Sequence, residues 1–430
     1  RDLHKEYRRQ RQMCIRDRLL IYGDYDVDGV SSTALLTEML TDLGWTVQPH
    51  LPGRFDDGYG LSVVSLEKCI EQYKTDIVLA VDCGSTAVEA IAFLNEREVD
   101  VLVLDHHQVS APPPEPLAMV NPQLSDDYPN FQELCSVGLA FKLAHALVKR
   151  GRQEGLQKER DLDLKQYIDL VALGTVADLV PLTGENRKLV HSGLEQLGET
   201  TRPGLIALKN VANVSKPVTV FNVGFHLGPR LNAAGRMDNP DAALNLLIAK
   251  DRYEADKAAD ILDNYNRERR EIERDISTQA VESVRQRFDP EEDFVIVEGN
   301  MEWHLGVIGI VATGQVQTIA ILIDAIFVDV TCHGVDGWIL VIAVIQRRVA
   351  IAIFVGVFVL ADVLDLGGGA AAIGGPARVV RCGDLHVDIG PASGIDGMTR
   401  APVLVGHGSS IVPGKGAVEV FILQTDPGAG

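Results

Sequence analysis

The sequence predicts an α/β fold built on a parallel sheet. Between residues 19 and 105, short apolar runs alternate with longer amphipathic stretches, which is typical of parallel strands joined by crossover helices. Acidic residues follow these runs at once, and open α/β sheets carry their functional groups on loops at the carboxyl ends of the strands. With 430 residues, 46% of them hydrophobic, the chain is long enough for two or three domains.

The first elements follow in order along the chain. Buried parallel strands are expected at residues 19–22, 76–81 and 101–104, and crossover helices at 32–43 and 88–97. Two further amphipathic helices are expected at 137–150 and 166–177, the second of which leads directly to Asp178. Residues 252–287 are dense in charge, with apolar residues three and four apart. They predict one long exposed helix, about 50 Å at ~1.5 Å per residue, which acts as a solvated spacer between two lobes.

A second lobe is expected to begin after this helix, with a strand at 293–298 and a helix from residue 304 to 312. The composition then changes, because only ten of the 60 acidic and six of the 40 basic residues follow Ala312. The strands that can be drawn beyond Ala312 lack a period of two. We hypothesise that a frame shift or misjoined sequence produced residues 313–430. Translating the coding DNA in its other two frames tests this, and failure of both frames to restore a second-lobe pattern would refute it.

Charge, cysteine content and hydrophobicity limit the possible functions and the possible location of the protein. A net charge of −20 argues against a protein that coats nucleic acid indiscriminately, although a local basic groove can hold a phosphate backbone. The six cysteines include no C-x-x-C pair, which favours a reducing compartment, and we expect the cytoplasm. Residues 1–18 are too charged for an export signal. The most apolar run, 349–361, is shorter than the ~20 residues that span a bilayer, so no membrane span is expected.

Acidic and imidazole side chains recur on loops after the predicted strands. They are Asp24, Asp26 and Asp28 after the first strand, Asp82 after the second, His106 after the third, and Asp178 after a helix. Carboxylates that converge in a fold repel one another unless cations lie between them, so we predict a two-metal site. The mixture of carboxylate and imidazole ligands favours Mn²⁺, with Mg²⁺ as the second candidate.

Two alternatives exist for the first acidic segment. The D-x-D-x-D-G spacing also opens a calcium-binding EF-hand loop, but the twelfth position of such a loop would be Leu35 instead of a bidentate glutamate, and the segment follows a strand. A solvated acidic turn is the other alternative. Asp82, His106 and Asp178 argue against it, because they supply the partners that a metal site needs.

The same residues carry a family resemblance. Asp24-Tyr-Asp-Val-Asp-Gly29, Asp82, Asp105-His-His107 and Asp178, in this order, resemble the signature motifs of the DHH phosphoesterases. Leu227-Gly-Pro-Arg-Leu-Asn-Ala-Ala-Gly-Arg-Met237 and Trp303-His-Leu-Gly-Val-Ile-Gly-Ile-Val-Ala312 resemble segments of the RecJ-type exonucleases in that superfamily. The resemblance runs from about residue 19 to 312. It implies a non-native leader at 1–18, a DHH metal-binding lobe at 19–250, a linking helix at 251–290, the start of a DHHA1-like second lobe at 291–312, and an unmatched, aberrant tail at 313–430.

The resemblance also implies a chemistry. Asp24 and Asp26 would hold one ion, Asp28, His106 and Asp178 the other, and Asp82 both. Two ions about 3.5–4 Å apart activate water and neutralise charge on phosphoryl oxygens. The implied function is 5′-to-3′ exonuclease hydrolysis of single-stranded DNA by a two-metal mechanism, in DNA repair and recombination. Single-strand-binding protein or a helicase are the implied protein partners, and a monomer is expected.

Other site residues have weaker signals. Asp105 is expected to accept the second N–H of the ligating imidazole and fix its tautomer. For His107 three roles are open: it contacts the scissile phosphate, it protonates the leaving group, or it is merely structural. Arg230 and Arg236 suit phosphate binding, with Asn232 a weaker candidate, and His304 resembles the second lobe's contribution to substrate binding. In the family-like loop 51–61, Arg54 and Tyr59 are candidates for nucleic-acid contacts, although a turn packed on the sheet explains its glycines equally well.

Two rival functions remain open. A DHH phosphodiesterase for short oligonucleotides or cyclic dinucleotides would share the metal residues, but residues 228–237 and the long helix favour the exonuclease. Digestion of a long 5′-phosphorylated strand against a dinucleotide would separate these enzymes. The other rival is a non-catalytic replication scaffold that keeps the fold without its metals. The intact acidic set argues against this scaffold.

Overall fold

The computed structural model describes residues 18–54, 60–124, 131–288 and 295–312, and five short strands at 340–343, 350–352, 378–382, 385–389 and 421–423. Tyr59, nearly all of the predicted leader and most of the predicted tail lie outside the described residues. The chain divides into two compact units, Arg1–Glu268 and Arg269–Gly430. The predicted metal residues all belong to the first unit.

Five parallel strands form the sheet of the first unit, in the order β2-β1-β3-β4-β5. They are β1 (Arg18–Tyr22), β2 (Thr46–His50), β3 (Ile77–Val81), β4 (Asp100–Leu104) and β5 (Ala118–Val120). The predicted α/β class and its three central strands are confirmed. The two edge strands were missed because their local signals are weak. β2 contains Pro49, which only an edge strand tolerates well, and β5 has three residues.

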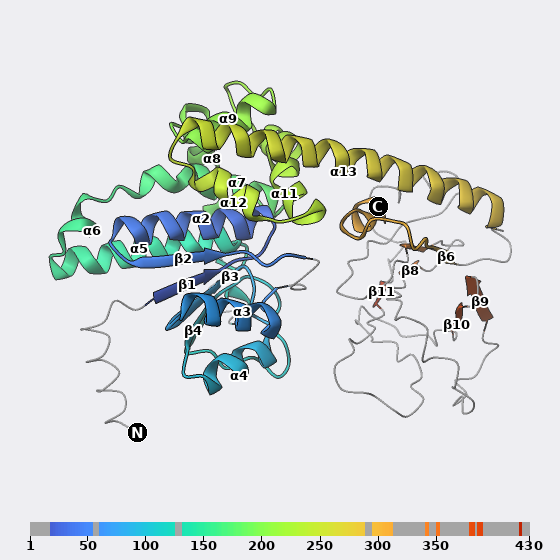
Figure 1. Cartoon of the computed structure of the whole chain (residues 1–430), viewed down its shortest axis with the longest axis horizontal. Coiled ribbons are helices and arrows are strands. Elements are labelled where there is room, and N and C mark those ends of the chain that lie inside the picture. The colour runs from blue at the N-terminus through green and yellow to red at the C-terminus, as the bar shows by residue number, and fades with distance from the viewer. Residues whose placement is uncertain are drawn as a thin grey trace. The chain divides into compact units, whose positions relative to one another are not determined.

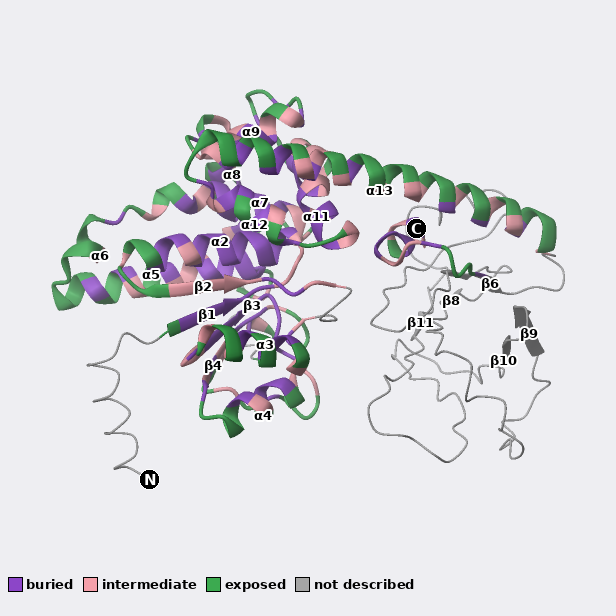
Figure 2. Ribbon diagram, viewed as in Figure 1, coloured by how far each residue is buried: buried purple, intermediate pink, exposed green. Residues whose placement is uncertain are grey.

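Helices cover both faces of this sheet (Figure 1). α2 (Val27–Asp42) and α5 (Ser136–Glu154) cover one face, and α3 (Val63–Tyr73) and α4 (Val88–Glu96) cover the other. The strand β1 serves both cores because successive side chains of a strand point to opposite faces. Leu19 and Ile21 pack with α2, whereas Leu20 and Tyr22 pack with α3 and α4. Figure 2 shows how completely α2 is buried.

A helical layer follows the sheet in the sequence. Its elements are η1 (Pro122–Leu124), α6 (Gln157–Asp161), η3 (Leu164–Tyr167), α7 (Ile168–Ala177), α8 (Gly184–Glu199), α9 (Pro203–Val211), α10 (Val220–Asn222), the π-helix η4 (Val223–Leu227), α11 (Gly228–Met237) and α12 (Asp241–Ile248). α7 is central to this layer, because every residue from Asp169 to Val176 is buried. It packs against α2, α5 and α8. None of the helices in the described part of the chain combines the length and apolar character that a membrane crossing needs.

The long helix α13 (Arg252–Arg287) has the predicted bounds but not the predicted role. It was expected to be a solvated spacer, yet it buries one apolar stripe. Ala255, Ala259 and Leu262 are buried in the first unit. Ile276, Ala280 and Val284 are buried in the second unit. The spacing of three and four residues that made the helix recognisable is therefore the spacing of a packed face.

The second unit is described mainly by its backbone. β6 (Val295–Glu298) pairs antiparallel with β7 (Leu340–Ala343), as do β8 (Ala350–Ala352) with β11 (Phe421–Leu423) and β9 (Arg378–Cys382) with β10 (Leu385–Ile389). Residues 305–312 are helical, as the sequence predicts. The indole N–H of Trp303 donates to the side-chain oxygen of Gln279, at 2.8 Å, and so fixes this segment on α13.

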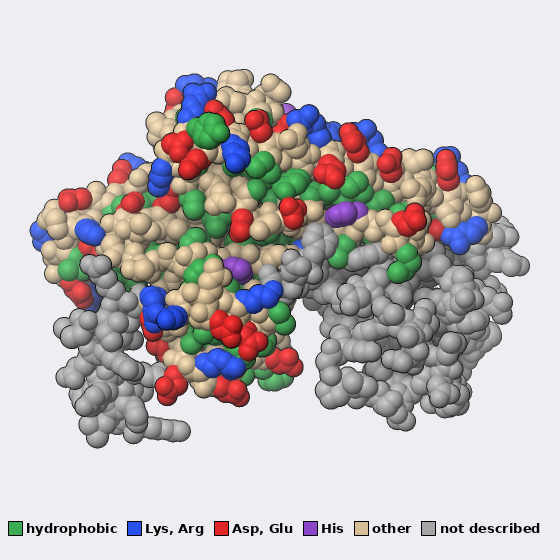
Figure 3. Space-filling model, viewed as in Figure 1, with side chains coloured by type: hydrophobic (Ala, Val, Ile, Leu, Met, Phe, Trp, Pro, Cys, Tyr) green, Lys and Arg blue, Asp and Glu red, His purple; other side chains and the backbone are tan. Residues whose placement is uncertain are grey.

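On the face in Figure 3, acidic and basic side chains are intermixed.

Candidate metal centre at the carboxyl edge of the sheet

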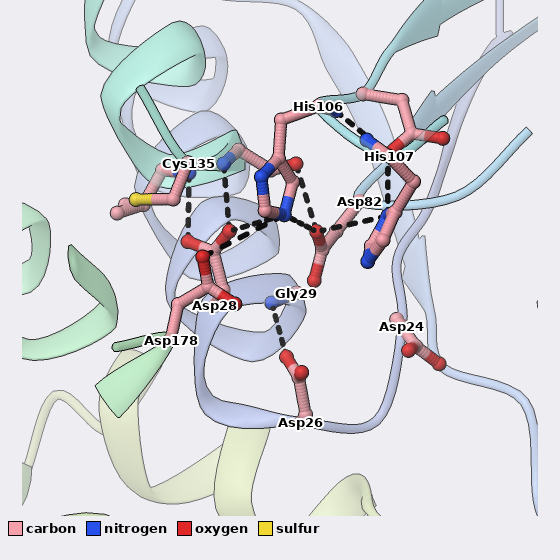
Figure 4. Close-up of polar contacts among 12 residues, drawn as sticks. Asp24, Asp26, Asp28, Gly29, Asp82, His106, His107, Cys135 and Asp178 are labelled. Carbon is pink, nitrogen blue, oxygen red and sulfur yellow. Dashed lines mark hydrogen bonds and ion pairs between the residues drawn. The ribbon is translucent and has the colours of Figure 1, made fainter. Parts of the chain in front are cut away.

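The predicted acidic residues gather at one edge of the sheet (Figure 4). The loop after β1 carries the three aspartates of the first segment, and the loops after β3 and β4 carry Asp82 and His106. Because the strands are parallel and Val81 pairs in register with Leu104, these loops leave the sheet side by side. Asp178 reaches the same place as the C-terminal cap of α7.

The first acidic segment is shaped by the start of α2. The Asp26 carboxylate accepts a hydrogen bond from the N–H of Gly29, at 3.0 Å, and so caps the helix. Gly29 is required there, since a Cβ atom would lie 2.5 Å from the carbonyl oxygen of Asp24. This cap starts the helix at Val27, earlier than the predicted residue 32, and places Asp28 in its first turn. Negative charge is favourable at that position.

Asp28 and Asp82 are held by the N-terminus of α5. The Asp28 carboxylate accepts hydrogen bonds from the N–H groups of Ser136, at 2.6 Å, and Val137, at 2.8 Å. The Ser136 hydroxyl donates to Asp82 Oδ1 at 2.8 Å. Asp82 itself has a left-handed backbone with a φ of 64°, and its side chain is almost fully buried. Cys135, just before the helix, completes a group with Asp28 and Asp178 whose ligand atoms lie within 4.8 Å of one another.

Three buried polar atoms in this cluster lack a hydrogen-bond partner among the described residues. They are Asp82 Oδ2, His106 Nε2 and Asp178 Oδ2. His106 Nε2 lies 3.4 Å from Asp82 Oδ1, 3.6 Å from Asp178 Oδ2 and 3.9 Å from Asp28 Oδ2. Ligand atoms that each lie about 2.0–2.2 Å from one ion are themselves roughly 3–3.5 Å apart. The donor types and their separations therefore fit a shared divalent cation.

A second group lies beside the first. Asp24, Asp26 and Asp82 each offer an oxygen within 4.8 Å of the others. In Figure 4, both residues lie on the loop that leads into α2, with Asp24 on the side of Asp82 away from Asp178 and Asp26 below the cluster. Asp82 thus neighbours both groups, as expected for a residue shared by two ions.

The electrostatics of the cluster also fit cations. Burial first, and then the charge of Asp26, raise the pKa of Asp24 and that of Asp28 to about 7. Burial and the neighbouring Asp28 raise the pKa of Asp178 to about 8 and that of Asp82 well above its ordinary value. Burial and the adjacent His107 lower the pKa of His106 to about 4, so its imidazole is neutral at pH 7, as a metal ligand must be.

The hydrogen-bond partner of Asp105 differs from the one predicted from the sequence. It was expected to accept the ring N–H of the ligating imidazole, His106. Its Oδ1 instead lies 2.8 Å from the ring Nδ1 of His107 and accepts the backbone N–H of His106 at 2.8 Å. Despite burial, the contacts with His107 and Ser85 lower the pKa of Asp105 below its usual range. The hydrogen bond to Asp105 raises the pKa of His107 to about 9, so this half-exposed imidazole is protonated at neutral pH.

The residues predicted to bind substrate lie in different parts of the structure and have different hydrogen-bond partners. Arg230 was expected to hold phosphate, but its Nε donates to Asp263 at 2.9 Å and its Nη1 to the carbonyl of His226 at 2.7 Å. Asn232 accepts the N–H of Val27 at 3.0 Å, and so positions the acidic loop from α11. Both side chains are thus engaged in contacts within the protein.

The remaining predicted contacts lie in three places. Arg236 is a partly buried residue in the last turn of α11. The guanidinium carbon of Arg54 lies 5.7 Å from the ring centre of Tyr25, which itself stands between Asp24 and Asp26 in the acidic loop. His304 belongs to the second unit, where its Nδ1 accepts the N–H of Gly306 at 3.2 Å.

Sequence reasoning missed the residues that hold the site from α5. Ser136 and Cys135 carry no acidic or basic signature, and the contacts of Ser136 to Asp28 and Asp82 span more than fifty residues of sequence. A serine directly before an apolar helical run was the one available signal. Asn121 was also missed. Its amide donates to the carbonyl of His107 at 2.8 Å and to the Ser85 hydroxyl at 2.7 Å.

The chain is similar to known proteins of one family. Residues 18–175 match the model of the DHH family, N-terminal domain. The single-stranded-DNA-specific exonuclease RecJ of Bacillus subtilis (strain 168) is 37% identical over 304 residues, 70% of this chain and 37% of that protein. A crystal structure of exonuclease RecJ bound to manganese is 32% identical with a TM-score of 0.61, and the match covers 74% of this chain and 76% of that one. RecJ from Thermus thermophilus in complex with Mg²⁺ is 29% identical with a TM-score of 0.51, over 74% of this chain and 41% of that one. The chain spans between 37% and 53% of the length of the curated relatives it matches.

Proposed function

Because this chain belongs to the DHH family, we propose that it is a metal-dependent exonuclease that hydrolyses phosphodiester bonds of single-stranded DNA from the 5′ end. The observation that carries the proposal is the convergence of Asp82, His106 and Asp178 on one point with buried atoms that no described residue satisfies. The similar proteins named as single-stranded-DNA-specific exonucleases supply the substrate class.

The proposed cofactor is a pair of divalent cations, Mn²⁺ before Mg²⁺. Asp24 and Asp26 would hold one, Asp28, His106 and Asp178 the other, with Asp82 between them. RecJ structures with manganese and with Mg²⁺ support divalent ions in this fold. When bound, such ions activate water as a nucleophile and neutralise charge on the phosphoryl oxygens.

The protein's own groups supply the remaining steps. His107 is protonated at neutral pH and faces solvent beside Asp82, so it can donate a proton to the leaving oxygen. Asp105 orients that ring and keeps it charged. Arg54 and Arg236 are the proposed phosphate contacts, since Arg54 lies over Tyr25 in the acidic loop. Arg230 and Asn232 are proposed to act indirectly, by fixing α11 and the loop.

A strand-degradation assay tests the proposal. With Mn²⁺, the full chain should shorten a single strand labelled at its 3′ end progressively from the other end, and should leave a blunt duplex intact. Efficient cleavage of dinucleotides or cyclic dinucleotides with little action on the long strand would favour the small-substrate phosphodiesterase instead. Absence of hydrolysis on every substrate, with DNA binding retained, would favour the non-catalytic scaffold.

A role in DNA repair and recombination and a cytoplasmic location belong to the same proposal. The described cysteines Cys69, Cys83 and Cys135 are free thiols, which suits a reducing compartment. We also propose that residues 19–250 carry the chemistry and that the helix at 251–290 links this metal lobe to a second lobe. Single-strand-binding protein or a helicase are the proposed partners of a monomer, and co-purification with either one would test this.

A further inference from the structure

Two phenylalanine rings are displayed to solvent on a short helical segment of the first unit. Phe221 in α10 is 58% exposed, and Phe225 in the π-helix η4 is 69% exposed. The rings stack on each other, with centroids 4.7 Å apart and planes 26° from parallel. The rings of Phe221 and His226 are nearly perpendicular, with centroids 5.5 Å apart, so Phe225 forms the outer end of the stack. Leaving two large rings in water forgoes about 1.5–3 kcal/mol of burial for each.

The backbone segment that carries these rings is held in place by several contacts. Thr219 and Asn222 form a reciprocal capping box at the start of α10. Val223 and Leu227, on the opposite side of the turn, are fully buried in the core of the first unit. The Arg230 guanidinium donates to the carbonyl of His226 at 2.7 Å and is itself paired with Asp263. π-helical turns are rare and frequently occur at functional sites, and the widened turn of η4 carries Phe225.

This segment adjoins the candidate metal centre. η4 packs on α7, the helix that ends at Asp178. A Cβ atom on Gly228, the first residue after η4, would lie 3.6 Å from the side chain of Ala177, the residue before Asp178. Phe225 is thus three residues before the glycine that meets the end of α7, and Phe221 is one turn further back. The rings belong to a segment that packs against the helix ending at Asp178.

We propose that Phe221 and Phe225 form a stacking platform for a base of the single-stranded DNA. The inference rests on the proposed function and adds a residue-level contact to it. A ring face binds any of the four bases, because every base has a π-face, which suits an enzyme that must move along a strand of any sequence. A net charge of −20 weakens the general attraction for phosphate, and stacking supplies affinity that does not depend on charge.

The test compares natural strands with strands that carry one abasic sugar at successive positions from the 5′ end. Non-hydrolysable phosphorothioate linkages at that end allow affinity to be measured by fluorescence anisotropy with the full chain and Mn²⁺. At one position, loss of the base should weaken binding by the wild type roughly 5- to 150-fold. Phe225→Leu should bind both strands equally weakly, since leucine keeps the apolar surface but removes the ring. Phe225→Trp should retain the discrimination, and the effect should persist at high salt.

Tyr253→Leu is the matched control, because Tyr253 is an aromatic residue that is 79% exposed on α13, outside the platform. It should discriminate as the wild type does. Circular dichroism shows whether each variant is folded. The platform is overturned if the wild type degrades single-stranded DNA yet binds natural and abasic strands equally at every position, which would leave the pair as a docking surface for another protein. If the wild type neither binds nor degrades single-stranded DNA, the proposed function itself fails.

Discussion

Two clusters of buried carboxylates lie at opposite ends of the same two helices. Asp28 begins α2 and Asp178 ends α7, whereas Glu38 lies near the end of α2 and Asp169 near the start of α7. The second pair is bridged by Arg202, which contacts Glu38 and lies 3.3 Å from Asp169. Lys250 adds a contact to Glu38 at 2.9 Å. At the first pair, the base that lies between the two carboxylates is the neutral imidazole of His106, and the protonated His107 lies at the edge of the cluster, 4.0 Å from Asp82.

The difference between the two clusters indicates which of them binds a cation from solution. Carboxylates are costly to bury without a cation, and the fold supplies a permanent one at the Glu38 end. The Asp28 end keeps its acids buried with raised pKa values and unsatisfied oxygens. An arginine at that end would neutralise the acids but would also block the site. We therefore infer that the cluster without an arginine or lysine between its acids is the functional one.

The largest expected effect comes from Asp82→Asn. This change removes the carboxylate shared by both groups, so nuclease activity with Mn²⁺ should fall about 10³-fold or more. The metal-free protein should become more stable, because a neutral amide replaces a buried carboxyl group whose pKa the fold raises. Exonuclease rates and thermal midpoints in EDTA measure the two effects. Unchanged activity would support the non-catalytic scaffold instead.

Arg202→Met should destabilise the protein by about 3–5 kcal/mol, because it leaves Asp169 buried without its cation and Glu38 with Lys250 alone. Urea denaturation measures the free energy of unfolding. Mn²⁺ should restore little of this loss, since the ion belongs to the other cluster. Adding Glu38→Gln and Asp169→Asn to the same variant should recover part of the stability. Full rescue by Mn²⁺ alone would mean that the two clusters are not separate.

Asp105→Asn tests the titratable cation at the edge of the metal cluster. With Asp105 present, His107 stays protonated up to a pKa of about 9, so activity should decline only as the pH rises through that value. Without the carboxylate, the alkaline decline should move toward the ordinary histidine pKa of about 6.5. The pH profile of kcat measures this shift. An unmoved profile would leave Asp105 and His107 with a structural role.

Metal-free stability should fall as the pH rises from about 4 to about 8. The pKa values of Asp24, Asp28 and Asp178 are raised to about 7 or 8 in the fold, so the folded state holds protons that the unfolded chain has released. His106, whose pKa is lowered to about 4, opposes this trend below pH 6.5. Saturating Mn²⁺ should therefore raise the thermal midpoint more at pH 8 than at pH 5. An equal gain at both pH values would contradict the linkage.

The smallest effect is expected for Ser136→Ala, which removes the hydroxyl that donates to Asp82 but keeps the backbone N–H that binds Asp28. Mn²⁺ affinity, measured by calorimetry, should weaken about tenfold. Ser32→Ala is the matched control. The Ser32 hydroxyl is also buried but has no hydrogen-bond partner among the described residues, so its loss should not alter Mn²⁺ affinity.

The sequence predicted the parts of this structure that depend on local pattern. The central strands β1, β3 and β4 are apolar runs followed at once by acidic residues, and parallel pairing then brings those residues to one edge. The bounds of α13 followed from its spacing. Edge strands β2 and β5 have no comparable pattern, because one side of each is free of sheet contacts.

Side-chain partners could not be read from local pattern. The Asp105 carboxylate contacts the ring of His107 instead of that of the adjacent His106. The Arg230 guanidinium binds Asp263 on α13 instead of facing solvent. Both outcomes depend on how the loops and helices pack, which residue types alone do not encode. The support from α5 to Asp28 spans 108 residues and is likewise invisible in one sequence.

The left-handed backbone of Asp82 has a consequence for how this fold can change over time. A residue with a side chain is held there at a cost of about 1 kcal/mol, which glycine would not incur. Replacement by glycine would thus relieve strain and remove a buried acid in a single step. Glycine at position 82 in a descendant would therefore indicate that the proposed metal-dependent activity has been lost there.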